Sequence, residues 1–426
     1  MSHSFSIFPL EKLSSHVEIT SGFTFKSEQF VDDSTQIPLV KGENVQQGYI
    51  DWGVSKYWRA DDYNNLEKYH LVTGDIVLAM DRPWVTAGLK WAHIKKHDPK
   101  SLLVQRVARL RAKNKLNQDY LRFLISSNYF SGYVQPIVTG VNIPHISGKQ
   151  IGDFKIPLPS LESQKKIAAI LSAYDDLIEN NKRRIALLEN MAEEIYREWF
   201  VRFRFPNYKN AEFEKGIPKG WELVTLDKAF KCLGGGTPSK ESNAYWKEGD
   251  INWYTPSDIT GAEGFFLSSS KDKCNEEGLA RSSAKMFPAY SIMTTSRATI
   301  GATGINTSPA CTNQGFITCI PNKKYPLTYL YYWFKLSKSH FVMLSGGATF
   351  PELSKTTFKR IEILTPSHEI IDEFDKIVKP IFEQIEKLLA MNENLKESKN
   401  SLLPRLISGK LTVENLNIQF PPSMEM

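Results

Sequence analysis

Apolar side chains follow regular steps of three and four residues through the middle of the chain. The positions are Ile167, Leu171, Tyr174, Ile178, Asn181, Ile185, Leu188, Ala192, Ile195 and Trp199. One such residue every 3.5 positions, roughly, forms the seam of a heptad coiled coil. The pattern therefore predicts one long helix over residues 161–205.

The same spacing returns near the carboxyl end of the chain. Its seam consists of Phe374, Val378, Ile381, Ile385, Leu388, Asn392, Leu395, Lys399, Leu402 and Leu406. A second long helix is expected over residues 367–412. Each seam contains one asparagine, and antiparallel pairing places Asn181 opposite Asn392, where the two amides can hydrogen-bond. We therefore predict that the two helices pair as an antiparallel coiled coil.

Outside these helices, short apolar runs alternate with Gly, Asp and Asn, which is typical of strands and turns. Residues 37–40, 75–79 and 103–110 are examples. A short helix is expected at 118–127, and a strand closed by prolines at 151–159. Ser160 is a suitable N-cap for the first long helix.

The whole plan occurs twice along the chain. Residues 156–159 (IPLP) match residues 363–366 (ILTP), Gln105 matches Gln314, and Arg82 falls close to Arg297. We predict an α+β protein with two mixed α/β domains in tandem repeat, each followed by a long helix. The expected parts are a first domain (1–160), its helix (161–205), a linker (206–220), a second domain (221–366), its helix (367–412) and a tail (413–426).

Composition narrows the class of protein only slightly. The net charge of +6 is compatible with nucleic-acid binding without being evidence for it. No two of the four cysteines have CxxC spacing, so we expect neither a disulfide framework nor a metal site. No apolar run reaches the roughly 18 residues of a membrane span, and a signal-peptide pattern is missing. A cytoplasmic protein is expected.

The sequence has none of the catalytic motifs that we looked for. It lacks a GxxxxGK[ST] nucleotide loop, an HExxH metal motif and the Asn/Asp-Pro-Pro-Tyr/Phe stretch of amino-methyltransferases. The histidines have no counterparts between the two repeats. An enzyme duplicated in tandem would be expected to duplicate its catalytic residues. The repeated positions are Gly, Pro, Gln, Arg and apolar residues, which favours scaffold and recognition roles.

Two further patterns allow more than one interpretation. Residues 234–240 (GGGTPSK) form either a phosphate-binding cradle or a tight turn between strands. Alternating Arg109, Arg111 and Lys113 place three cations either on a binding face or on a solvated edge strand.

Several stretches of the second repeat resemble one known family. They are residues 235–240 (GGTPSK), 245–246 (YW), 249–258 (GDINWYTPSD), 296–301 (SRATIG) and 312–316 (TNQGF). Residues 199–203 (WFVRF) and 402–410 (LLPRLISGK) are similar to the ends of that family's two helices. The family is that of type I restriction–modification specificity subunits. One departure is the family's Glu-Gln pair at the helix start, which is Ser163-Gln164 in the first repeat and Ile370-Ile371 in the second.

The resemblance implies a DNA-reading subunit that is not itself an enzyme. Each of two target-recognition domains would contact one half of a bipartite site in double-stranded DNA. Two modification subunits would bring S-adenosylmethionine, and restriction subunits would bring ATP and Mg²⁺, so this chain would need no cofactor of its own. The alternatives are a structural or adaptor coiled-coil protein, or the specificity module of another restriction or methylation enzyme.

Base reading requires Arg, Lys, Asn, Gln, Ser or Thr side chains in a DNA groove. The loops at repeat-equivalent positions offer such residues, and Arg82 and Arg297 are the expected guanine readers. The candidates are Lys41, Asn44, Arg82, Thr139 and Asn142 in the first domain and Thr255, Ser257, Arg297, Thr299 and Thr349 in the second.

Overall fold

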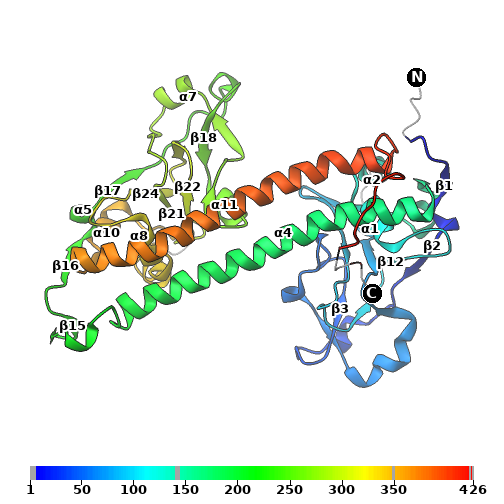
Figure 1. Ribbon diagram of the computed structural model, residues 1–426, viewed down its shortest axis with the longest axis horizontal. Coiled ribbons are helices and arrows are strands. Elements are labelled where there is room, and N and C mark those ends of the chain that lie inside the picture. Colours follow the sequence, from blue (N-terminus) through cyan, green and yellow to red (C-terminus); the bar gives the residue numbers. More distant parts are fainter. Residues whose placement is uncertain (1–5, 140–143, 348–350, 422–423, 425–426) are drawn as a thin grey trace. The chain divides into compact units, whose positions relative to one another are not determined.

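The computed structural model describes residues 6–139, 144–347, 351–421 and 424. The chain forms two compact units, whose elements are labelled in Figure 1. The first unit comprises Met1–Ile178 with Leu395–Met426, and the second comprises Glu179–Asn394. The chain passes from one unit to the other twice, each time within a long helix.

The first unit is built on a five-stranded and a four-stranded sheet. In spatial order, the larger sheet contains β2 (Val17–Ser21), β12 (Val107–Ala112), β7 (Ile76–Ala79), β10 (Trp91–His93) and β4 (Gln47–Gly48). The smaller contains β5 (Tyr57–Trp58), β3 (Ile37–Val40), β11 (Ser101–Leu103) and β6 (His70–Leu71). All four residues of β7 are buried, as expected for an apolar run in a central strand.

The second unit repeats this strand order. Its larger sheet contains β17 (Lys231–Gly234), β24 (Phe316–Ile320), β21 (Ile292–Thr295), β22 (Thr303–Asn306) and β19 (Phe266–Leu267). A three-stranded sheet contains β20 (Asp272–Cys274), β18 (Ile251–Tyr254) and β23 (Ala310–Thr312). In the antiparallel registers, Val107 faces Ala79 in the first unit and Phe316 faces Thr295 in the second. The sheets therefore support the duplication at the level of individual residues.

Short helices follow the last strand of each larger sheet. They are α1 (Gln118–Ser126), α2 (Asn128–Val138) and α3 (Gly148–Asp153) in the first unit, and α8 (Leu327–Leu336), α9 (Lys338–Met343) and α10 (Lys355–Arg360) in the second. A strand then leads to the long helix. This strand is β13 (Lys155–Pro157), paired with β1 (Leu10–Lys12), or β25 (Glu362–Thr365), paired with β16 (Glu222–Thr225).

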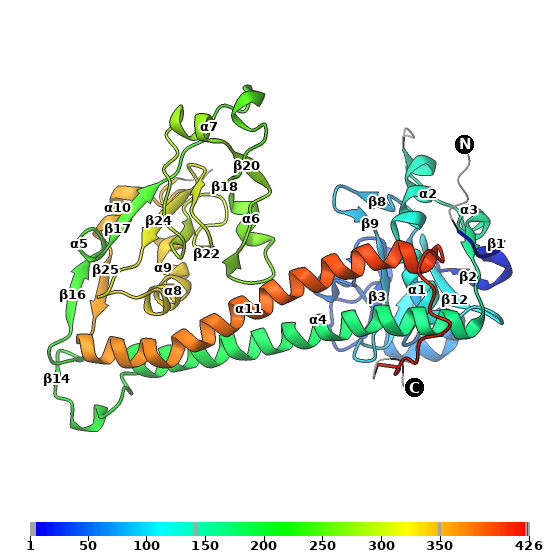
Figure 2. The ribbon, with the colours of Figure 1, turned by 45° about the horizontal axis from the view of Figure 1, so that its top comes forward.

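The long helices are α4 (Leu161–Tyr196), extended by a π-helical turn (Arg197–Val201), and α11 (His368–Ile407). The Ser160 hydroxyl accepts a hydrogen bond from the Ser163 amide (3.2 Å), so Ser160 caps α4 as predicted. Within each unit the two helices lie side by side (Figure 2). Every position of the two predicted seams is buried or partly buried.

The contacts between α4 and α11 run in opposite chain directions. In the second unit, Asn181 Nδ2 donates to Asn392 Oδ1 at 2.9 Å, and the Trp199 and Phe374 rings lie 5.9 Å apart. In the first unit, the Lys399 ammonium pairs with Asp175. The asparagine layer is therefore formed as the seam pattern predicts, and the pairing is antiparallel.

Four element boundaries differ from the sequence prediction. Residues 103–110 form no single strand, because a turn at Arg106 (φ 66°) separates β11 from β12. Residues 151–153 end α3 rather than begin a strand. The first helix stops before residue 205, since Phe203 has φ 55°, and the second ends at Ile407, two residues before Gly409 (φ 81°).

The predicted linker contains a small hairpin. Strands β14 (Phe213–Glu214) and β15 (Ile217–Pro218) are joined by Lys215 and Gly216, both with positive φ. Two such residues match the twist of a hairpin turn. The remaining short strands and α-helices of the described residues are β8 (Trp84–Val85), β9 (Gly88–Leu89), α5 (Leu226–Ala229), α6 (Pro256–Thr260) and α7 (Glu276–Ala280).

Candidate nucleic-acid interface

Most of the candidate DNA contacts lie in loops that follow equivalent strands. Lys41 and Asn44 follow β3 and Arg82 follows β7, whereas Thr139 follows α2. In the second unit, Thr255 precedes α6, Ser257 lies within it, and Arg297 and Thr299 follow β21. Asn142 and Thr349 lie outside the described residues.

In the first unit, Asp81 joins three chain segments. Its Oδ2 lies 2.7 Å from Arg106 Nη1, and its Oδ1 lies 2.6 Å from His145 Nδ1. Backbone bonds support the same junction, because Arg82 N donates to Pro144 O (2.7 Å) and Met80 N donates to Arg106 O (2.8 Å). The loop after β7, the β11–β12 turn and the segment before α3 therefore form one surface.

The second unit has the same backbone junction with different side chains. Ser296 N donates to Gly315 O (2.7 Å), as Met80 N does to Arg106 O. Leu353 N donates to Ser296 O (3.0 Å), as Ile146 N does to Met80 O (2.9 Å). The Arg297 guanidinium forms an ion pair with Glu352 (2.8 Å). Isolated antiparallel bridges join Asp81 to His145 and Arg297 to Glu352, which makes the two pairs equivalent.

This equivalence corrects the sequence alignment by one position. Arg82 (φ 43°) and Ala298 (φ 58°) occupy the same left-handed position after β7 and β21. Arg297 therefore corresponds to Asp81 rather than to Arg82. Arg82 and Arg297, the two expected guanine readers, therefore do not occupy equivalent positions. The sequence could not reveal this, because neither Arg82 nor Ala298 is a residue type that favours positive φ.

The Asn44 side chain is buried, which does not fit its expected role as a DNA contact. Its side chain is 1% exposed, and Oδ1 accepts from Lys41 N (2.8 Å). Its Nδ2 donates to Leu39 O and to Ser55 Oγ, both at 3.0 Å. With its amide buried and bonded in this way, Asn44 shapes the loop and is not available to a base edge.

The corresponding loop of the second unit is held in the same way. Asp258 accepts from Thr255 N (2.7 Å), and the Thr255 hydroxyl lies 2.8 Å from the hydroxyl of Ser257. Ser257 and Thr299 are exposed, and Thr255 is partly exposed. These three residues are therefore accessible at the surface of the second unit.

The side chains of Lys41 and Thr139, two other candidates of the first unit, each have a partner within the chain. Lys41 is partly exposed and pairs with Glu43 at 3.2 Å. Thr139 is exposed, but its hydroxyl donates to Gln135 O (2.7 Å). Lys90, which sequence reasoning missed, donates to Gly42 O beside Lys41, and burial lowers its pKa. Lys90 N also donates to Pro83 O (2.7 Å), which places this lysine next to the residue that follows Arg82.

The alternating cations of β12 are not a binding face. Arg109 is 2% exposed and donates to Lys68 O (2.9 Å), and burial lowers its pKa. Arg111 donates to Asp75 at 2.8 Å, and this bond raises the pKa of Arg111. Both guanidiniums satisfy internal acceptors, so neither the binding-face nor the solvated-edge interpretation describes them.

Residues 234–240 begin with the last residue of β17 and continue as a closely packed irregular segment, so they form neither a tight turn nor an open phosphate cradle. A Cβ at Gly235 or Gly236 would lie within 2.5 Å of neighbouring backbone atoms, and Gly236 N already donates to Thr312 O. The Lys240 ammonium lies 3.7 Å from the centroid of the Trp246 ring and pairs with Asp272 (2.7 Å). The glycines thus allow close packing.

Three exposed residues at the junctions of Asp81 and Arg297 were not among the candidates predicted from the sequence. Gln105 and Gln314 occupy equivalent turns before β12 and β24, and Arg106 follows Gln105. The match of Gln105 to Gln314 was visible in the sequence and could have identified the glutamines. Nothing in the sequence marks Arg106, because its exposure depends on a left-handed turn.

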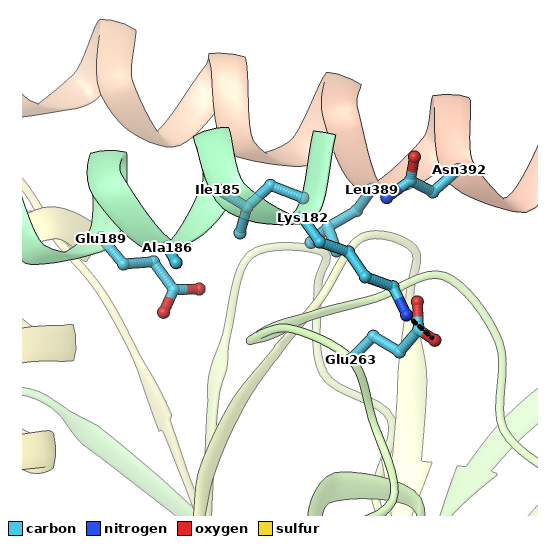
Figure 3. Close-up of a pocket in the computed structure, with 7 residues that line it drawn as sticks. All are labelled: Lys182, Ile185, Ala186, Glu189, Glu263, Leu389 and Asn392. Atoms are coloured by element: carbon cyan, nitrogen blue, oxygen red, sulfur yellow. Dashed lines mark hydrogen bonds and ion pairs between the residues drawn. The ribbon is translucent and has the colours of Figure 1, made fainter. Parts of the chain in front are cut away.

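A separate pocket of about 240 Å³ lies in the second unit along α4 and α11 (Figure 3). Its lining residues are Lys182, Ile185, Ala186, Glu189, Glu263, Leu389 and Asn392. Two of these residues, Lys182 and Glu263, form an ion pair (3.1 Å; Figure 3). This pocket contains none of the candidate DNA contacts.

The described part of the chain contains no group of three or more His, Cys, Asp or Glu side chains arranged to hold a metal ion. No helix within the described ranges is long and apolar enough to cross a membrane.

Comparisons with known proteins agree with this architecture. Residues 11–190 and 218–403 match the model of the type I restriction modification DNA specificity domain. The MjaIX specificity subunit of Methanocaldococcus jannaschii is 31% identical over 315 residues, which cover 71% of each chain. The putative MjaX specificity subunit of the same organism is 28% identical and covers 93% of this chain and 91% of its own.

A solved structure shares the fold across nearly the whole length. It is a type I restriction–modification S subunit from M. genitalium, with a TM-score of 0.58 and 14% identity, covering 96% of this chain and 98% of that one. Because the family model matches two tandem segments that span most of the sequence, the chain belongs to the type I restriction–modification DNA specificity family.

Proposed function

We propose that this chain reads a two-part target in double-stranded DNA, with one part recognised by each unit. The observation that carries the proposal is the junction at Asp81 and Arg297, where one backbone arrangement presents different side chains in the two units. A duplicated scaffold with different exposed polar groups is suited to reading two different base sequences.

The chain would serve this function without catalysing a reaction itself. The modification subunits would supply S-adenosylmethionine and methylate the DNA, and restriction subunits would supply ATP-driven cleavage with Mg²⁺. Support comes from the family assignment and from the names of the relatives, each of which is a specificity subunit of a type I restriction enzyme. Isolated chain that consumes S-adenosylmethionine in the presence of DNA would contradict this division of roles.

The central test is the pattern of methylated sites in cells that express this chain together with its modification subunits. We expect methylation at one target made of two short specified sequences separated by an unspecified gap. Cells with the modification subunits alone are the control and should lack these sites. A single uninterrupted target, or the same sites without this chain, would refute the proposal.

A further inference from the structure

We infer that Arg106 in the first unit and Arg297 in the second each read a guanine, and that Asp81 and Glu352 hold them in position. The inference rests on the proposed function and names the side chains that would give it specificity. It replaces Arg82 with Arg106 as the base-reading arginine of the first unit.

Arg106 combines exposure with a fixed orientation. Its side chain is 69% exposed, whereas the side chain of Asp81, which binds it, is 26% exposed. The backbone is fixed as well, because the Arg106 carbonyl accepts a hydrogen bond from Met80 N in a left-handed turn. One edge of the guanidinium is thus tied to the protein while the rest points outward.

Arg297 in the second unit is also exposed and held by a carboxylate, although it stands at a different position of the junction. Its side chain is 48% exposed, and Nη2 lies 2.8 Å from Glu352 Oε1. At the equivalent junction, Arg297 stands where the first unit has Asp81, and Gly315 stands where it has Arg106. At this junction each unit therefore presents a guanidinium held by a carboxylate, and the arginine comes from a different segment of the junction in each unit.

A supported guanidinium is well suited to reading guanine. Arginine has five N–H donors in a planar fork, so a carboxylate can hold one of them while others reach O6 and N7 of guanine in the major groove. The support also reduces the rotamer freedom that the long side chain loses on binding. An exposed ion pair contributes little to stability, so removing the carboxylate should leave the fold intact.

Arg82 offers a matched control on the same surface. Its side chain is exposed and forms no ion pair with any residue in the described ranges. An exposed cation that is not held by a carboxylate suits a phosphate contact, which affects all sequences alike. Substituting Arg82 should therefore weaken binding without changing base preference.

The test uses the full chain assembled with its modification subunits. It measures binding to the DNA target that the methylated sites identify, and to duplexes changed at single base pairs of that target. Arg106→Ala should reduce discrimination by about 5- to 150-fold at one G·C pair of one half-site. Arg297→Ala should do the same in the other half-site. Asp81→Asn and Glu352→Gln should each weaken preference at the same base pair as the arginine that they support.

Arg106→Lys separates base reading from charge. Lysine keeps the positive charge but lacks the fork, so discrimination should fall while the overall salt dependence stays unchanged. Equal loss of affinity for every duplex in Arg106→Ala, or rescue of discrimination by Arg106→Lys, would overturn the inference. A wild-type complex without any sequence preference would overturn the proposed function itself, and this is measured before any variant is made.

Discussion

His93, at the end of β10, lies 3.3 Å from Arg122 Nη1 through its Nε2, and its titration has a consequence for stability. Desolvation, with the nearby charge of Arg122, lowers its pKa from 6.5 to about 3. Lys95 and Lys399 act in the same direction. Because the unfolded chain binds the proton more readily, the folded state should lose stability as the pH falls from 6.5 towards 3.

The expected loss from His93 is up to about 2 kcal/mol between pH 7 and pH 5, since each unit of pKa difference corresponds to about 1.4 kcal/mol. Urea unfolding of the full chain at both pH values measures it. His93→Gln, which cannot take up the proton, should flatten this part of the pH dependence. An unchanged pH profile in that variant would contradict the assignment.

At the scale of elements, the asparagine layer fixes how α4 meets α11. Asn181 and Asn392 are 4% and 1% exposed, and they hydrogen-bond to each other. Asn181→Leu should destabilise the chain by about 1–3 kcal/mol, because it leaves a buried amide without its partner. The double variant Asn181→Leu/Asn392→Leu should recover most of that loss.

Chemical unfolding of the two single variants and the double variant measures this coupling. Substitution of Leu187, which is 68% exposed on the same helix, by Ala is the matched control and should have little effect. Strictly additive losses in the double variant would show that the two amides act independently.

The elements differ in how far the sequence predicted them. The long helices were predictable because their apolar period continues through ten positions, and the strands at 37–40 and 76–79 because apolar runs in sheets are distinctive. The turn at Arg106 was not, since local sequence gives no sign that arginine will adopt positive φ. The ion pairs of Asp81 and Arg297 join segments far apart in the chain, so only the folded structure could reveal them.

At the scale of the whole molecule, the net charge of +6 adds an attraction to DNA that does not depend on sequence. Affinity of the assembled complex should therefore fall as salt increases, with a logarithmic slope set by the number of phosphates neutralised. Arg82→Ala should reduce that slope by about one. Binding titrations over a range of salt concentrations measure the slope.

The control for Arg82 is Lys219→Ala, because Lys219 lies beside the β14–β15 hairpin and pairs with Glu212 at 2.7 Å. Its loss should leave the slope unchanged. If both variants change the slope equally, the positive charge acts diffusely and the loop containing Arg82 is not a local phosphate contact.

The equivalent pairs Asp81–His145 and Arg297–Glu352 carry the acidic and the basic residue in opposite order. This difference limits which substitutions can produce a new DNA target. Asp81→Arg alone would set a third basic group beside Arg106 and His145, and Glu352→Lys alone would face Arg297 with a like charge. Either single substitution would place like charges next to each other in the junction, so the effect of one substitution depends on the residue at the partner position. A mutant library that aims at new half-sites should therefore vary both partners of each pair together, because libraries of single changes would sample mainly mispaired surfaces.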